Sequence, residues 1–349
     1  MSTFRVALSG DFRKPDGRPA YPDFDLAPLT SNEAVEVVHV DPVGGHMPAE
    51  ALEDIDALIL LVPKFTAESV PKSGRLSVVA RFGVGYDNVD LDACTANGIA
   101  AVITPDGVRR PVAVSVITFM LALAGRMRIK DRLCREGPDG WARRSEYMGM
   151  GVTGRVLGQL GIGNIGAEVF RMARPFDMTF IAHDPYADPA LAKELGVELV
   201  SLEDLFRRSD FLSVSVPLND ETRGIVNAER LALMKPTAYV INTARGPIVD
   251  QKALTEALAS GIIAGAGLDV FEVEPTPADE PLLAMDNVIL APHSLCWTDE
   301  CFAGNGAADV RAVLDVMHGR EPRGIVNRDV IGSDAFKARL DAYAKRFAG

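Results

Sequence analysis

Three ionisable residues follow short apolar runs in the second half of the chain: Arg245 in INTARG, Glu274 in FEVEP and His293 in LAPHS. Together they carry the groups needed to reduce a carbonyl by hydride transfer. A histidine, which titrates near neutral pH, can deliver a proton to the developing alkoxide. A nearby glutamate favours the protonated imidazole. A planar guanidinium can bind a carboxylate through two parallel hydrogen bonds and polarise the adjacent carbonyl oxygen.

Each of these three residues also has a purely structural interpretation. Arg245 could form a surface ion pair, Glu274 could be a loop charge before a proline, and His293 could cap a helix or lie in the core. The catalytic interpretation depends on their shared position, because each follows a predicted strand of one sheet. The carboxyl ends of parallel strands lie at one edge of a sheet, so we interpret the three as one catalytic group.

A glycine-rich turn is the second chemical feature. An apolar run, Val156–Leu160, leads into the turn and a helical pattern, and a second run, Met178–Ala182, follows. The turn contains Gly161, Gly163 and Gly166. In a dinucleotide site the first glycine makes the tight turn, the second lets the backbone approach a pyrophosphate, and the third lets helix pack on strand. The phosphates would bind the N–H groups at the start of the helix.

Asp184 follows the second of these strands and indicates which nicotinamide cofactor is used. A carboxylate at this position can accept hydrogen bonds from both hydroxyls of the adenosine ribose. It would also repel a 2′-phosphate, so the sequence predicts NAD rather than NADP. A glycine turn without a ligand is the alternative, but the two flanking strands and the acid favour a cofactor site.

Length and composition restrict the class of protein. A chain of 349 residues exceeds what one core usually supports, so two domains are expected. The net charge of −12 and the lack of basic tracts argue against nucleic acid or a membrane surface as partner. The four cysteines show neither CxxC spacing nor a disulfide framework, and no signal peptide or metal site is predicted. We therefore expect a cytoplasmic protein.

The pattern of apolar runs predicts an α/β protein with mostly parallel sheets. Predicted strands in the first part of the chain are Phe4–Leu8, Val35–Val40, Ala57–Val62, Leu76–Val79 and Ile99–Ile103. A long helix is expected over Pro111–Arg128, and its apolar part, Val112–Ala124, is too short to span a bilayer and predicts a buried helix. An irregular arm is expected over Arg132–Met150. Strands and helices then alternate up to Val288–Leu290.

Several motifs, in this order and spacing, resemble the D-isomer-specific 2-hydroxyacid dehydrogenase family. They are RFGVGYDNVD, GRVLGQLGIGNIG, SVPLNDETRGIVN, LMKPTAYVINTARGPIVD, AGAGLDVFEVEP and the Pro292-His293 pair. The resemblance implies an NAD-dependent oxidoreductase that interconverts a small D-2-hydroxy acid and its 2-keto acid. It implies that Arg245 binds the substrate carboxylate and carbonyl, that His293 is the general acid/base, and that Glu274 is the partner of His293.

The same resemblance implies further binding residues. Backbone amides of Val84 and Gly85 would hold the substrate carboxylate. The residues implied in cofactor binding are Gly161, Gly163, Asn164, Ile165, Gly166, Asp184, Val216, Pro217, Thr243, Ala244 and Asp269.

The resemblance also implies two doubly wound parallel-sheet domains with an active-site cleft between them. A flavodoxin-like substrate domain would comprise residues 1–110 and 298–349, and a Rossmann NAD-binding domain residues 111–297. A homodimer is expected, in which the arm around Trp141 packs across a twofold axis.

Two segments depart from the pattern of the family. Ser294-Leu295-Cys296-Trp297 replaces a small, glycine-rich turn, so bulk there would reshape the pocket near the nicotinamide. Arg110 either reaches a second anionic group of the substrate or is a solvated arginine at a helix start. Two other functions remain: a cofactor-sensing, corepressor-like binding protein and a formate-type dehydrogenase. His293 and Glu274 favour alcohol and carbonyl chemistry, because hydride abstraction from formate releases no hydroxyl proton.

Overall fold

The computed structural model describes residues 3–347, and the contacts within the chain divide it into two compact units. Unit 1 comprises residues 1–108 and 297–349, and unit 2 comprises residues 109–296. Each unit is built on its own parallel sheet, so the predicted α/β class with two parallel-sheet domains is confirmed. The assignment of the two domains to substrate and cofactor stays a prediction.

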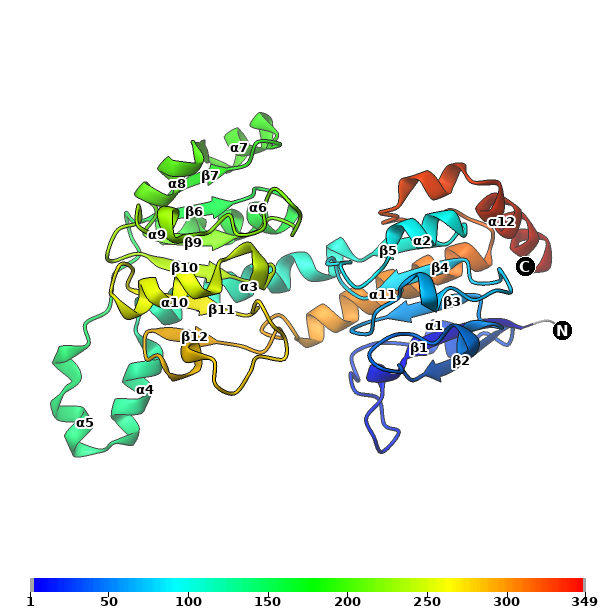
Figure 1. Ribbon diagram of the computed structural model, residues 1–349, viewed down its shortest axis with the longest axis horizontal. Coiled ribbons are helices and arrows are strands. Elements are labelled where there is room, and N and C mark those ends of the chain that lie inside the picture. The colour runs from blue at the N-terminus through cyan, green and yellow to red at the C-terminus, as the bar shows by residue number, and fades with distance from the viewer. Residues whose placement is uncertain (1–2, 348–349) are drawn as a thin grey trace. The chain divides into compact units, whose positions relative to one another are not determined.

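Unit 1 contains a five-stranded sheet with the order β2-β1-β3-β4-β5, in which all neighbouring strands are parallel (Figure 1). Its strands are β1 (Phe4–Ser9), β2 (Val35–Val40), β3 (Ala57–Leu60), β4 (Val78–Arg81) and β5 (Ala100–Ile103). Its α-helices are α1 (Ala27–Thr30), α2 (Leu91–Ala96), α11 (Asp299–Met317) and α12 (Asp334–Phe347). This strand order is that of flavodoxin-like folds.

The ends of two strands in unit 1 differ from the prediction. The third strand ends at Leu60 because the amide of Val62 turns to the carboxylate of Asp11, 2.9 Å away, and the Val62 side chain is 63% exposed. The fourth strand begins at Val78, two residues later than predicted, and continues to Arg81. The loop after Arg81 therefore starts directly at the carboxyl end of β4.

Unit 2 contains a seven-stranded parallel sheet with the order β12-β11-β10-β9-β6-β7-β8. Its strands are β6 (Val156–Leu160), β7 (Thr179–His183), β8 (Glu198–Leu199), β9 (Phe211–Val214), β10 (Tyr239–Asn242), β11 (Gly265–Leu268) and β12 (Val288–Leu290). The chain starts at the interior strand β6, adds β7 and β8 on one side and then crosses to β9 on the other. That reversal makes the fold doubly wound.

The helices of unit 2 either precede β6 or lie between its strands. They are α4 (Met127–Arg135), α5 (Pro138–Ala142), α6 (Asn164–Ala173), α7 (Pro189–Leu195), α8 (Leu202–Arg208), α9 (Ala228–Leu231) and α10 (Gln251–Ala259). Three neighbouring strands of this sheet, β9, β10 and β11, are buried along their whole length, as expected for parallel strands covered on both faces. The predicted alternation of strands and helices is therefore present from β6 to β11, and a 3-10 turn at Pro281–Ala284 replaces a helix before β12.

The long helix α3 spans Pro105–Ala124, so the predicted bounds, Pro111–Arg128, are wrong at both ends. Pro105 occupies the first helical position, where its missing N–H costs no hydrogen bond. The helix ends before Gly125, and Arg126 adopts a left-handed conformation with φ 51°. Among the described residues, α3 alone has the length and hydropathy to cross a membrane, but 67% of its apolar window is buried inside the protein. The predicted burial of this helix is confirmed. The prediction that its apolar part is too short to span a bilayer is wrong, because the helix is long enough to do so.

The arm after α3 is more regular than predicted. It contains α4, α5 and a 3-10 turn at Arg144–Glu146, and Figure 1 shows α4 and α5 extending away from the seven-stranded sheet. Gly137, with φ 68°, and Pro138 at the start of α5 separate the two helices. The arm therefore presents helical surfaces, on which the side chain of Trp141 is 62% exposed.

Candidate active site

His293 and Glu274 form a hydrogen-bonded pair in unit 2. The Nδ1 atom of His293 lies 2.7 Å from the Oε2 atom of Glu274. Glu274 lies in the loop after β11, and His293 lies after β12, the neighbouring strand in the sheet. The two side chains are 42% and 35% exposed, so a small molecule can reach them. The structure therefore brings together two of the three predicted catalytic residues.

The electrostatics of Glu274 determine which nitrogen of His293 carries a proton. Burial opposes ionisation of Glu274, but the hydrogen bonds from His293 and the Phe271 amide, with the charge of Arg245, hold its pKa below the usual range. An ionised carboxylate can only accept hydrogen bonds, so Nδ1 of His293 must be the donor. The lone pair or proton on Nε2 is then available for chemistry.

The turn that carries His293 is fixed by Asp269, a buried residue at the end of β11. The carbonyl oxygen of Asp269 accepts a 2.7 Å hydrogen bond from the amide of His293. Its carboxylate accepts hydrogen bonds from the amides of Ser294 and Leu295 at 2.9 and 3.1 Å. Burial raises the pKa of Asp269, although these two amides and His293 oppose the shift. His293 has φ 52°, a left-handed conformation that these bonds stabilise.

Arg245 follows β10 and immediately precedes a 3-10 turn, Gly246–Ile248. The buried side chain of Asn242 holds this turn, because its Nδ2 donates to the carbonyl of Arg245 and its Oδ1 accepts from the amide of Ala244. One guanidinium nitrogen of Arg245 donates to the Ala244 carbonyl at 2.7 Å. The charge of Arg245 contributes to the lowered pKa of Glu274, so all three predicted residues belong to one electrostatic group.

The loops after β10 and β11 touch at Gly246. A Cβ atom built on Gly246 would lie 1.9 Å from the carbonyl carbon of Phe271, so a side chain at this position has no room. The amide of Phe271 donates to Glu274 at 2.9 Å. The close approach at Gly246 therefore links the backbone that carries Arg245 to the backbone that orients Glu274.

The glycine turn after β6 has the backbone features expected of a dinucleotide site. Gly161 has φ 93°, and a Cβ there would lie 2.8 Å from Val216. A Cβ on Gly166 would lie 2.4 Å from the carbonyl oxygen of Gly161, so the helix can approach the strand only without one. By contrast, no described atom lies within 4 Å of a Cβ built on Gly163. The second glycine thus faces open space at the start of α6, where Asn164 and Ile165 form the first turn.

Asp184 follows β7 beside this turn. Its carboxylate accepts hydrogen bonds from the amide of Ile162 at 3.0 Å and from the amide of Tyr186 at 2.9 Å. The hydroxyl of Tyr186 donates to Glu221 at 3.2 Å. A carboxylate has about four acceptor positions, so Asp184 keeps capacity for further donors. The structure therefore places the acid next to the glycine turn, as the NAD prediction requires.

The other predicted cofactor residues of unit 2 follow β9 and β10. Val216 and Pro217 come after β9, and Thr243 and Ala244 come directly after β10. Val216 and Ala244 are partly buried against one apolar core. Pro217 is held by a 2.6 Å hydrogen bond from the Thr222 hydroxyl to its carbonyl oxygen. These residues share the carboxyl edge of the sheet with the glycine turn.

Comparison with known proteins identifies the family. Residues 117–294, within unit 2, match the model described as "D-isomer specific 2-hydroxyacid dehydrogenase, NAD binding domain". A glyoxylate reductase of Korarchaeum cryptofilum is 42% identical over 284 residues, which cover 81% of this chain and 86% of that protein. The chain belongs to the D-isomer specific 2-hydroxyacid dehydrogenase family. It is an NAD-dependent oxidoreductase that interconverts 2-hydroxy and 2-keto acids.

Two solved structures agree with this assignment. A glyoxylate reductase from Paecilomyes thermophila has a TM-score of 0.79 and 29% identity, with 93% of this chain and 99% of that chain covered. The holo form of Rhodotorula graminis D-mandelate dehydrogenase has a TM-score of 0.79 and 28% identity, with 93% and 98% covered. The similarity therefore extends through both units of the dehydrogenase.

NAD fits the residues of unit 2. When bound, it supplies the hydride acceptor or donor of the reaction. The open space at Gly163 and the amides of Asn164 and Ile165 suit a pyrophosphate, and Asp184 suits a ribose with free hydroxyls. Within residues 3–347, no group of three His, Cys, Asp or Glu side chains could hold a metal ion.

The two predicted substrate-binding residues of unit 1, Val84 and Gly85, lie in the loop after β4. This loop is braced at Gly83, whose amide donates to the hydroxyl of Thr104 at 2.8 Å and whose carbonyl accepts from the Thr104 amide. The guanidinium of Arg81 packs against Gly83, so that a Cβ there would lie 1.9 Å from it. The backbone at Val84 and Gly85 is therefore held in a defined loop.

Three residues that position the site were not predicted. Asn242 supports the turn at Arg245, Gly246 allows the two loops to touch, and Gln251 holds the FEVEP loop by accepting from the Glu272 amide at 2.9 Å. For two of them the sequence contains an indication, because they lie close to Arg245. Asn242 ends the strand shortly before Arg245, and Gly246 directly follows Arg245. Arg110, by contrast, lies inside α3 and not at its start, and it forms a 2.6 Å ion pair with Glu168, so the predicted solvated arginine at a helix start is wrong.

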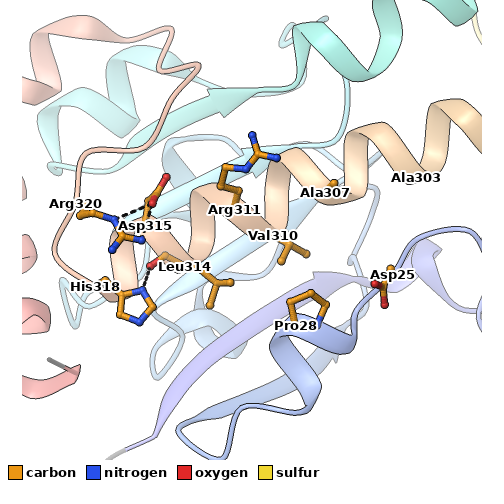
Figure 2. A pocket seen from close by; sticks show the side chains of 10 residues that line it. All are labelled: Asp25, Pro28, Ala303, Ala307, Val310, Arg311, Leu314, Asp315, His318 and Arg320. Atoms are coloured by element: carbon orange, nitrogen blue, oxygen red, sulfur yellow. Dashed lines mark hydrogen bonds and ion pairs between the residues drawn. The ribbon is translucent and has the colours of Figure 1, made fainter. Parts of the chain in front are cut away.

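A cavity of about 380 Å³ lies elsewhere, between α1 and α11 of unit 1 (Figure 2). Ala303, Ala307, Val310 and Leu314 supply its apolar wall. At one end Arg320 pairs with Asp315, and His318 bonds to the carbonyl of Leu314. None of the predicted site residues lines this cavity.

Proposed function

We propose that His293 is the general acid/base of the dehydrogenase, with Glu274 as its partner. In the reducing direction, Nε2–H of His293 would donate its proton to the oxygen of the substrate as the carbonyl becomes an alcohol. In the oxidising direction, the Nε2 lone pair would take that proton back. The 2.7 Å contact between Nδ1 and Glu274 carries this proposal, because it leaves Nε2 as the reactive nitrogen.

Arg245 is the third residue of the proposed site in unit 2, and the loop after β4 in unit 1 is a second proposed binding element. The guanidinium of Arg245 would bind the substrate carboxylate and polarise the carbonyl oxygen that receives the proton. The backbone amides of Val84 and Gly85 would donate to the same carboxylate. The proposed substrate is a small D-2-hydroxy acid or its 2-keto acid, consistent with relatives named glyoxylate reductase and D-mandelate dehydrogenase.

Oxidation of NADH in the presence of a panel of 2-keto acids tests this function directly. We expect turnover with at least one keto acid and none with formate in the presence of NAD. Turnover of no hydroxy or keto acid, with intact binding of NADH, would instead favour the cofactor-sensing function.

We further propose a cytoplasmic homodimer that uses the arm of α4 and α5. Three large apolar side chains of this region are strongly exposed: Met127 at 59%, Trp141 at 62% and Met148 at 75%. Large apolar side chains exposed on one arm are typical of interaction surfaces, and twofold dimers are the commonest oligomers. Light scattering at micromolar concentration should give the mass of a dimer, and Trp141→Glu should shift it towards the monomer. A wild type that is monomeric there contradicts the proposal.

A further inference from the structure

Two polar side chains lie next to each other inside the seven-stranded sheet of unit 2. Gln159 on β6 and Ser213 on β9 face each other across the two neighbouring strands, and both are fully buried. Leu157 and Phe211, two residues earlier on the same strands, belong to an apolar core that also contains Phe170 of α6. Side chains two residues apart on a strand share a face of the sheet, so the two polar groups point into an apolar region.

The hydrogen bonding of these two side chains is incomplete. Among the residues that the structure describes, neither the Nε2 atom of Gln159 nor the Oγ atom of Ser213 has a hydrogen-bond partner. The next strands on either side place only the apolar side chains of Ala182 and Ile241 beside them. A buried amide or hydroxyl without a partner makes a protein less stable than an apolar side chain of the same shape does. The stability of the fold therefore does not explain a glutamine at this position.

The other end of the Gln159 side chain makes a contact that does suggest a role. Its Oε1 atom accepts a 3.1 Å hydrogen bond from the hydroxyl of Ser215, which lies just after β9. The amide of Ser215 also donates to the carbonyl oxygen of Leu160, at 2.8 Å. Ser215 is thus joined to β6 through its side chain as well as its backbone. It directly precedes Val216 and Pro217, two of the predicted cofactor residues.

Ser215 packs against the glycine turn. A Cβ atom built on Gly161 would lie 2.9 Å from the carbonyl oxygen of Ser215, and one built on Gly166 would lie 3.7 Å from its Cβ atom. Ser215 therefore adjoins both the start of the turn and the first turn of α6. Because the packing is this close, a displacement of Ser215 would also displace the turn, whose open space at Gly163 suits the pyrophosphate of NAD.

We propose that Gln159 is a positioning residue for NAD. From inside the sheet it holds Ser215, and through Ser215 it holds the glycine turn in the geometry that binds the pyrophosphate. The inference depends on the assignment of NAD to the glycine turn and goes beyond the roles proposed for His293 and Arg245. Gln159 should therefore contribute to cofactor affinity without contributing to the stability of the fold, a combination that a purely structural residue does not produce.

Gln159→Met tests this role, because methionine has a similar length and removes both the bond to Ser215 and the unpartnered amide. Its dissociation constant for NADH, measured by fluorescence titration, should rise by about 2- to 10-fold, the range for one hydrogen bond. Its melting temperature without cofactor should equal or exceed that of the wild type. Ser213→Ala is the matched control. It removes the neighbouring unpartnered hydroxyl and no bond to Ser215, so its NADH affinity should stay at the wild-type value.

Ser215→Ala removes the other partner of the same bond and should weaken NADH binding by a similar factor. The double variant Gln159→Met/Ser215→Ala should bind NADH no more weakly than either single variant, because both substitutions break one bond. If the two effects add instead, the residues do not act through that bond and the positioning role is wrong.

The other outcomes also decide the proposal. If Gln159→Met binds NADH as tightly as the wild type, or if it loses affinity and melting temperature together, Gln159 does not position the turn. Where Gln159→Met does not fold, Ser215→Ala decides, since an unchanged NADH affinity in that variant overturns the role. A wild type that binds no NADH would overturn the cofactor assignment and the positioning role with it. A wild type that binds NADH but reduces no keto acid would overturn only the proposed function.

Discussion

The Nδ1 atom of His293 lies 2.7 Å from a carboxylate oxygen of Glu274, and this contact joins the loops that follow two adjacent strands. The segment after β11 holds both members of the pair. Asp269 fixes the backbone at His293, and the amide of Phe271 fixes the carboxylate of Glu274. The pair is therefore oriented before a substrate arrives, which general acid/base catalysis requires.

Replacing His293 tests its role as the acid. His293→Ala should lower kcat for keto-acid reduction by about 10²- to 10⁴-fold, the range for loss of a general acid. NADH affinity should change little, because the glycine turn and Asp184 are untouched. His318→Ala, which alters a histidine bonded within α11, should leave kcat near the wild-type value. If His293→Ala keeps a kcat near the wild-type value while the chemical step is rate-limiting, His293 is not the acid and its role is structural.

The pH dependence of reduction tests Glu274. Its pKa is lowered, so the carboxylate is ionised across the neutral range, and its support of the protonated imidazole is lost only as the pH falls through that lowered value. In Glu274→Gln the support is absent at every pH. As the pH rises, the rate of reduction should therefore begin to fall at a lower pH than in the wild type. Superimposable kcat/KM profiles for the two proteins would contradict the pairing.

Cofactor preference tests Asp184. Asp184→Asn keeps an acceptor for the amide of Ile162 and removes the negative charge. This variant loses the charged hydrogen bonds to the ribose and no longer repels a 2′-phosphate. Its preference for NAD over NADP should therefore fall by about 10- to 100-fold. Asp188→Asn alters a nearby carboxylate that caps α7 and is the control. A wild type that uses NADP as readily as NAD would show that Asp184 does not select the cofactor.

Local patterns predicted the cofactor turn well. The strand Val156–Leu160 has the predicted bounds, and the strand before Asp184 is displaced by one residue. Both are short apolar runs bounded by glycine or by a polar residue, so their limits are encoded locally. The pairing of His293 with Glu274 was also inferred, because two neighbouring parallel strands end at one edge.

Features that depend on distant contacts were not predictable in this way. Gly107 lies inside α3, in the first turns that the predicted helix, which began at Pro111, left out. A Cβ there would lie 2.2 Å from the side chain of Asn305. Only a glycine allows that approach, and nothing near Gly107 in the sequence indicates its neighbour. The bonds from Asp269 to the amides of Ser294 and Leu295 are likewise long-range, so the sequence indicated a cofactor residue there and not a support of His293.

The contact at Gly246 can be tested by substitution, which shows whether the contact between the two loops positions Arg245 or only stabilises the fold. In Gly246→Ala the new methyl group would overlap the backbone of Phe271, so the loops after β10 and β11 must move apart. Overpacking of this kind typically costs about 1–3 kcal/mol of the free energy of unfolding. The displacement would also shift Arg245 relative to Glu274, so both kcat and the KM for the keto acid should worsen.

Gly151→Ala provides the matched control for this variant. No described atom lies within 4 Å of a Cβ built on Gly151, so the same substitution should leave stability and kinetics nearly unchanged. Urea unfolding gives the stability of both variants, and steady-state kinetics with saturating NADH give kcat and KM. If Gly246→Ala is destabilised but keeps wild-type kcat and KM, the contact stabilises the fold without positioning Arg245. If it is as stable and as active as Gly151→Ala, the two loops do not meet closely at Gly246 in solution.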